Sequence, residues 1–171
     1  MKRILSIDGG GIKGVFAASF LAEIERHCEK PICKYFDLIC GTSTGAIIAS
    51  ALAVGISAKM ILDMYMEKGK EIFPKKRRLP LWGTKYRSEP LKKTLEEVFQ
   101  SNCIKDCKTR LLIPAYNLAS RKVRVFKTPH AEDLYFDKTL KIVDCLLATT
   151  AAPTYFSPHK MEGGVFIDGG V

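Results

Sequence analysis

The sequence has no CxxC pair, no internal repeat and no low-complexity tract. Among its six cysteines, Cys103 and Cys107 are four residues apart, but no second pair and no histidine stands at zinc-finger spacing, so we expect no structural zinc site. The basic N-terminus loses its apolar run at Asp8, which excludes a secretory signal. We therefore expect reduced thiols in a cytoplasmic protein.

Acidic residues are scarce beside basic ones: 18 Asp and Glu against 27 Lys and Arg give a formal net charge of +9. This surplus favours an anionic partner, either nucleic acid or a negatively charged membrane surface. Hydrophobic residues make up 47% of the 171 residues, which excludes a disordered tail and a small disulfide scaffold. The length predicts a single domain, residues 1–171.

Charge is absent between Asp37 and Lys59, and Gly41-x-x-x-Gly45 lies inside this stretch, as in paired transmembrane helices. Glycine, threonine and serine crowd into residues 41–45, however, no cation flanks the start, and a β-prone segment leads into the run. We therefore interpret it as a buried strand, a tight turn and a buried helix.

Hydrophobic spacing predicts strands and helices in alternation, which is typical of a sheet with parallel strands and right-handed crossovers. Strands are expected at residues 2–7, 35–40, 111–113, 122–125 and 164–167. Helices are expected at residues 15–27 and 46–54, after Ser57, at 88–99 and at 140–147.

The first candidate for chemistry is the loop from Asp8 to Gly14, between a strand and a helix. Successive glycines let backbone N–H groups turn toward one point, and the helix adds its positive end, so the loop is suited to an anion. Gly9, Gly11 and Gly14 also match the dinucleotide fingerprint G-x-G-x-x-G, which leaves a nicotinamide or flavin oxidoreductase as an alternative. Against it, Asp8 would face the pyrophosphate, and no acidic residue ends the next strand.

The second candidate is Gly41-Thr42-Ser43-Thr44-Gly45, a G-x-S-x-G turn between a strand and a helix. Such a turn projects a nucleophilic serine from the sheet edge. The third is Asp168, which follows a strand and precedes Gly169 and Gly170. Its carboxylate could accept the Ser43 proton.

Together with Ala148–Phe156, these segments, in this order, resemble the patatin-like phospholipases, acyl hydrolases with a Ser-Asp dyad. The resemblance implies a three-layer α/β/α fold with a mostly parallel central sheet and a nucleophile elbow. It also implies that fatty-acyl esters of glycerolipids are cleaved without calcium, other metal or cofactor. Family members continue past the Asp-Gly-Gly motif, so we expect this chain to lack a C-terminal part.

The resemblance assigns roles to single positions. Ser43 corresponds to the nucleophile and Asp168 to its base. Gly10, Gly11 and Ile12 would donate backbone N–H groups to an oxyanion hole, with Lys13 at the basic position of the loop. The supporting positions are the loop residues Gly9 and Gly14, the elbow residues Gly41, Thr42, Thr44 and Gly45, and Gly169 and Gly170 of the Asp-Gly-Gly motif.

A Ser-His-Asp triad is the competing mechanism, because Asp133, Asp137 or Asp144 followed by His159 would have the chain order of α/β-hydrolases. His159, however, is expected in a proline-rich turn, where a histidine is usually a solvated bystander.

The expected partner is a phospholipid or galactolipid at an anionic membrane surface, with no nucleic acid; oligomeric state stays open. The segment 73–82 joins four consecutive cations to Trp82 and fits membrane docking, a nuclear-localisation or nucleic-acid patch, or a solvated loop. Alternative functions are an esterase or thioesterase on soluble substrates, and an activator-dependent lipid-binding signalling module with weak catalysis.

Overall fold

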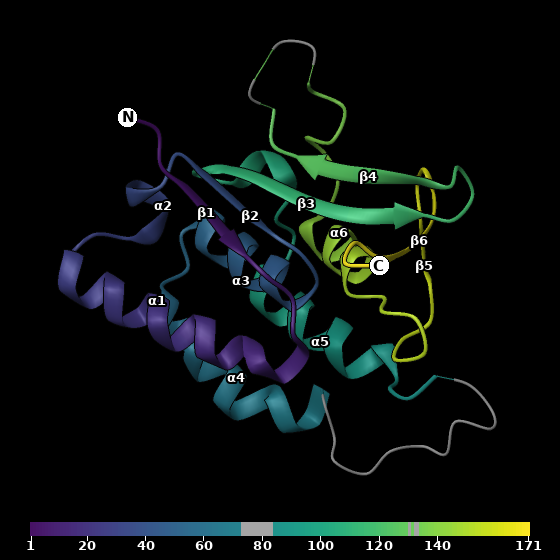
Figure 1. Ribbon diagram of the computed structural model, residues 1–171, viewed down its shortest axis with the longest axis horizontal. Coiled ribbons are helices and arrows are strands. Elements are labelled where there is room, and N and C mark those ends of the chain that lie inside the picture. The colour runs from purple at the N-terminus through teal and green to yellow at the C-terminus, as the bar shows by residue number, and fades with distance from the viewer. Residues whose placement is uncertain (73–83, 130, 132–133) are drawn as a thin grey trace.

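A computed structural model describes residues 1–72, 84–129, 131 and 134–171. It contains a six-stranded sheet in the order β1-β2-β3-β6-β5, with β4 paired to β3 (Figure 1). The strands are β1 (Ile4–Ile7), β2 (Leu38–Gly41), β3 (Arg110–Asn117), β4 (Lys122–Lys127), β5 (His159–Met161) and β6 (Gly164–Asp168). The segment 73–82 and Asp133 of the sequence analysis lie outside the described residues.

The helices confirm the predicted α/β class. They are α1 (Gly14–Cys28), α2 (Ile32–Tyr35), α3 (Thr44–Val54), α4 (Ala58–Ile72), α5 (Ser88–Phe99) and α6 (Ile142–Thr149), with 3-10 turns η1 (Gly11–Lys13) and η3 (Ile104–Asp106). In Figure 1, α3 and α6 lie against the sheet, and α1, α4 and α5 lie beyond them.

The sheet is mixed. β1, β2 and β3 are parallel, as expected, whereas β4, β5 and β6 pair antiparallel with their neighbours. The connections account for two of the antiparallel pairs: helices lie between β1 and β2 and between β2 and β3, whereas short turns join β3 to β4 and β5 to β6.

β3 pairs with three other strands, β2, β4 and β6. Leu112 pairs with both β2 and β4, and Ala115 pairs with both β4 and β6. β2 and β6 therefore share the edge of β3 opposite β4. They approach from opposite directions and end at either side of Pro114.

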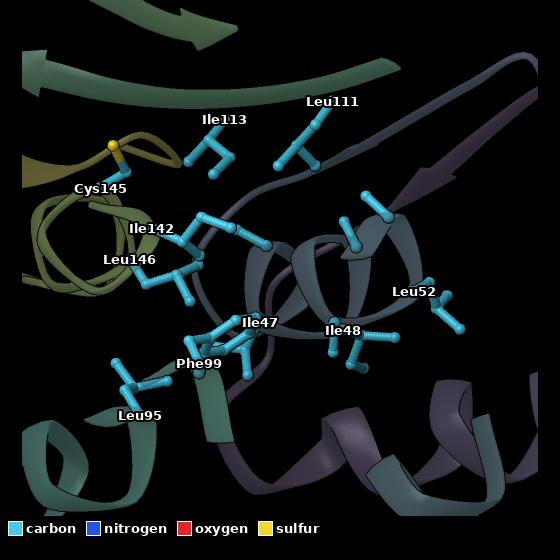
Figure 2. Packing of buried hydrophobic residues seen from close by; sticks show 14 of the residues in the cluster. Ile47, Ile48, Leu52, Leu95, Phe99, Leu111, Ile113, Ile142, Cys145 and Leu146 are labelled. Carbon is cyan, nitrogen blue, oxygen red and sulfur yellow. The ribbon is translucent and has the colours of Figure 1, made fainter. Parts of the chain in front are cut away.

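The uncharged segment is core, as predicted, and no described helix is long and apolar enough to cross a membrane. Every residue of α3 from Thr44 to Ala53 is buried. Figure 2 shows Ile47, Ile48 and Leu52 of this helix packed among side chains of β3, α5 and α6. This packing fixes the start of α3 against the ends of β1 and β2.

Two local expectations were wrong. Tyr35 ends the short helix α2 instead of opening a strand, because Pro31 and the Glu25 carboxylate cap that helix at Ile32. His159 begins β5 rather than occupying a solvated turn.

Candidate active site

Ser43 lies on the sharp turn between β2 and α3, with φ 55° and ψ −127°. A positive φ strains any residue with a side chain, and such strain clusters at functional sites. The turn is possible because Gly41 and Gly45 have no side chains. A Cβ on Gly45 would lie 2.2 Å from the Ile7 carbonyl oxygen, and one on Gly41 would lie 2.4 Å from the Gly45 oxygen.

The glycine loop passes directly over this turn. A Cβ on Gly9 would lie 2.9 Å from the Ser43 Cβ and 3.7 Å from its Oγ. The Gly10 N–H donates to Thr44 Oγ1 at 3.1 Å, which ties the loop to the first residue of α3. Thr44 is held in turn by the Tyr65 hydroxyl, which donates to its carbonyl at 3.2 Å. Burial raises the pKa of Tyr65, so its phenol stays a protonated donor.

The tie at Gly10 changes the expected set of oxyanion donors. Its N–H is occupied by Thr44, whereas the N–H groups of Gly11 and Ile12 make no hydrogen bond within the described residues. Lys13 and Gly14 border a neighbouring groove along α1 rather than the pocket beside Ser43. The amides of Gly11 and Ile12, which line the pocket, are therefore available as donors.

Asp168 ends β6 and is buried. Its N–H donates to the Ala151 carbonyl at 3.1 Å, and its Oδ1 accepts the Gly170 N–H at 2.9 Å. A Cβ on Gly169 would lie 2.3 Å from the Pro114 oxygen, so glycine lets the chain turn close to β3. Gly170 packs near both the Asp168 carboxylate and the Thr42 side chain.

These segments open onto one pocket of about 670 Å3. Ser43 and Asp168 both line it, although no hydrogen bond joins Ser43 Oγ to the Asp168 carboxylate in the described part of the chain. The predicted residues that line the pocket are Gly9, Gly10, Gly11, Ile12, Thr42, Ser43, Thr44, Asp168 and Gly170. Gly41, Gly45 and Gly169 instead allow the close backbone approaches that surround it.

The apolar wall of the pocket was missed by the sequence analysis. It comes from Tyr86, Leu91, Ala152, Tyr155 and Phe156. The last three lie in the Ala148–Phe156 motif, which could have pointed to them. Tyr86 and Leu91 have no local signal in the sequence. Backbone hydrogen bonds from Lys85 and Tyr86 to residues 154 and 155 hold this part of the chain beside the pocket.

The histidine of the competing triad lies elsewhere. His159 does not line the pocket, and its Nε2 is 3.5 Å from Asp144 Oδ1. Burial lowers the pKa of His159, while the nearby Asp144 raises it in part. Asp137 is buried and pairs with Arg124. The described residues therefore assemble no Ser-His-Asp triad, nor any cluster of three or more His, Cys, Asp and Glu side chains suited to a metal.

Comparison with known proteins identifies relatives. A family model described as "Patatin-like phospholipase" matches residues 5–171. The chain is 42% identical over 173 residues to a "cGAMP-activated phospholipase" of Pseudomonas aeruginosa, covering 98% of this chain and 52% of the relative. It is 43% identical over 184 residues to a protein of the same description from Escherichia coli, covering 99% and 52%. The chain thus spans about half the length of these curated relatives.

Among solved structures, VipD from Legionella pneumophila is similar in fold, with a TM-score of 0.59 and 17% sequence identity. The match covers 99% of this chain and 46% of VipD. At this identity the likeness concerns the fold alone.

Proposed function

Since this chain belongs to the patatin-like phospholipase family, we propose that it is the catalytic part of a lipid acyl hydrolase acting on membrane glycerolipids through Ser43 and Asp168. The observation that carries the proposal is the strained turn at Ser43, in one pocket with the Asp168 carboxylate and the unpaired amides of Gly11 and Ile12. A serine needs a base to attack an ester, and the developing oxyanion needs donors.

In the proposed reaction, Asp168 takes the proton of the Ser43 hydroxyl as Oγ attacks the ester carbonyl carbon. The Gly11 and Ile12 amides stabilise the negative charge on the carbonyl oxygen, where each such donor is worth about 2.7–4 kcal/mol in comparable sites. The protonated Asp168 then gives its proton to the leaving alcohol. Water, activated by the same carboxylate, attacks the acyl-enzyme and releases the fatty acid.

The walls of the pocket support this substrate class. Leu91 and Phe156 line it with apolar surface, and the exposed side chains of Ile12 and Tyr155 stand at its border. An acyl chain is matched by such walls, and the net charge of +9 favours an anionic bilayer over a neutral galactolipid surface. We therefore favour phospholipid esters, cleaved by a protein that binds the membrane peripherally and needs no calcium.

The proposal is tested by intact-mass analysis after reaction with a fluorophosphonate. We expect one adduct on the wild type, none on Ser43→Ala, and strongly slowed labelling of Asp168→Asn. His159→Gln is the matched control and is expected to label like the wild type. A folded wild type without an adduct, or equal labelling of Ser43→Ala, contradicts the proposed nucleophile.

Lipid specificity has its own assay. Fatty-acid release in EDTA is compared between phosphatidylglycerol vesicles, galactolipid vesicles and a soluble thioester. We expect release from phosphatidylglycerol to be fastest and to vanish in Ser43→Ala. Faster turnover of the thioester would favour the soluble-substrate alternative.

Regulation is proposed from the relatives, which are described as cGAMP-activated. We infer that the longer protein containing this chain is likewise switched on by a cyclic dinucleotide. Adding cGAMP to that protein should raise fatty-acid release, whereas the fluorophosphonate adduct on Ser43 identifies the site that is switched. Equal release with and without cGAMP contradicts this regulation.

A further inference from the structure

Thr149, which ends α6, joins two parts of the candidate site by a single hydroxyl group. Its Oγ1 accepts the backbone N–H of Ser43 at 3.1 Å and donates to the Pro114 carbonyl oxygen at 2.6 Å. The residue is fully buried. The hydroxyl thus uses its only proton and one lone pair, so both contacts fix its orientation.

The hydrogen bond between Thr149 and Ser43 is made by the backbone of Ser43, the residue with the strained positive φ. A partly buried N–H without a partner costs free energy, and Ser43 lies beyond Cys40, the last residue of β2 that pairs with β3. Because N–H and Cβ belong to the same residue, a partner that holds the N–H also limits how Ser43 can rotate about its backbone. The direction of Oγ is therefore coupled to Thr149.

The contact with Pro114 reaches β3, the strand with which both β2 and β6 pair. Pro114 is the point on β3 where β2 and β6 end from opposite sides. Gly169 packs against the same carbonyl oxygen, and the Asp168 N–H donates to Ala151, two residues after Thr149. The segment 149–151 thus contacts the backbone of both Ser43 and Asp168.

We propose that Thr149 is a positioning residue, which sets the place of Ser43 relative to Asp168 without touching the substrate. The inference rests on the proposed function, since it assigns Thr149 to the same reaction. It also gives the Ala148–Phe156 motif a role beyond lining the pocket. Misplacing a reacting group by about 1 Å costs on the order of 100-fold in rate, so a small shift of the turn is measurable.

The test compares three variants with the wild type. Thr149→Val keeps the shape and removes both hydrogen bonds, and Thr149→Ser keeps the hydroxyl. Thr94→Val is the matched control, because Thr94 is also a buried helical threonine whose hydroxyl donates to a carbonyl, that of Pro90 at 3.0 Å. For each, the fluorophosphonate labelling rate, kcat, KM and Tm are measured on folded protein.

We expect Thr149→Val to lower kcat and the labelling rate by more than about tenfold, with KM changed less than about twofold. Thr149→Ser should recover most of the rate. Thr94→Val should lower Tm and leave the rate unchanged. The positioning role is overturned if Thr149→Val reacts like the wild type, or if Thr94→Val slows the reaction equally.

Two further outcomes are informative. If Thr149→Val does not fold, Thr149→Cys carries the test, because a thiol weakens both hydrogen bonds at similar volume; wild-type rates in that variant overturn the role. A wild type that is folded and does not label contradicts the proposed function itself, whereas a labelled wild type with an equally fast Thr149→Val contradicts only this inference.

Discussion

Gly45 illustrates how single atoms decide the geometry around Ser43. The ends of β1 and the start of α3 approach so closely there that even a methyl group would overlap the Ile7 carbonyl oxygen. The residue is required by space rather than by its backbone angle, since it lies in a regular helical turn. The turn at Ser43 is thus held by a contact between two backbones.

We predict that Gly45→Ala forces these backbones apart. Overpacking of this kind destabilises by about 1–3 kcal/mol, and we expect the fluorophosphonate reaction to slow on the order of 100-fold. Urea unfolding and labelling rates measure the two effects. Gly163→Ala serves as the control, because a Cβ there meets open space and only the positive φ is strained. Normal labelling of Gly45→Ala would contradict the prediction.

The Thr44 hydroxyl holds the glycine loop, because its Oγ1 accepts the Gly10 N–H. Thr44→Val removes the acceptor and leaves a partly buried N–H unpaired, which costs roughly 1–3 kcal/mol. The glycine loop is then free to shift its amides, and we expect kcat to fall on the order of tenfold or more. Steady-state kinetics on phosphatidylglycerol vesicles measure the change in kcat. An unchanged kcat in a folded variant would show that the Gly10–Thr44 hydrogen bond does not position the loop.

At the level of whole elements, one carboxylate of α1 binds the first residues of two other helices, α2 and α4. Glu25 of α1 accepts the N–H of Ile32 at 3.0 Å and that of Ala58 at 2.6 Å, the first residues of α2 and α4. A negative charge at a helix N-terminus satisfies a free donor and interacts favourably with the helix dipole. One side chain therefore fixes the starts of two helices.

We predict that Glu25→Ala lowers the free energy of unfolding by about 1–3 kcal/mol, since two donors lose a charged acceptor. For a chain of this size that corresponds to a fall in Tm of roughly 2–4 °C for each kcal/mol. Glu67→Ala, at an exposed position of α4, should leave Tm nearly unchanged. Thermal unfolding followed by circular dichroism compares the pair, and equal Tm values would refute the capping role.

Elements with a strong period in the sequence were predictable, and those fixed by distant contacts were not. α3, α4 and α5 follow from spacing and caps, and the turn at Ser43 follows from its glycines. α2 depends on a carboxylate from α1, and β5 depends on pairing with β6, so neither has a local signal.

The candidate site likewise contains residues that local sequence predicts and residues that only distant contacts bring to it. Its loops were found from the sequence because glycine clusters dictate their own backbone. Tyr86 and Leu91 reach the pocket only through tertiary contacts. Thr149 binds Ser43 across 106 residues, a pairing that no spacing rule reveals.

For the molecule as a whole, pH acts on stability through His159. Burial holds its pKa below the ordinary value. The Asp144 carboxylate raises this pKa in part, and the positive charge of Lys92 lowers it. The folded state therefore binds a proton at His159 less tightly than the unfolded state does. The neutral His159 contributes fully to the free energy of unfolding above about pH 6.5, and this contribution is lost as the pH falls through the lowered pKa.

We predict that the wild type loses more stability than His159→Gln between pH 7.5 and pH 5, with pH values chosen to bracket the ordinary histidine pKa of about 6.5. Urea unfolding at both pH values gives the difference for each protein. The comparison cancels the other titrating groups, so an equal loss in both would show that His159 does not contribute.

The convergence of β2 and β6 on Pro114 also has a consequence for how the protein is made. A nascent chain whose β6 has not yet been synthesised carries Ser43 but no Asp168, and Thr149 reaches Ser43 only after α6 has docked. Contacts between such distant segments form late and slowly, because long loops must close first. The pocket that Ser43 and Asp168 line is thus completed only as the sheet itself is completed.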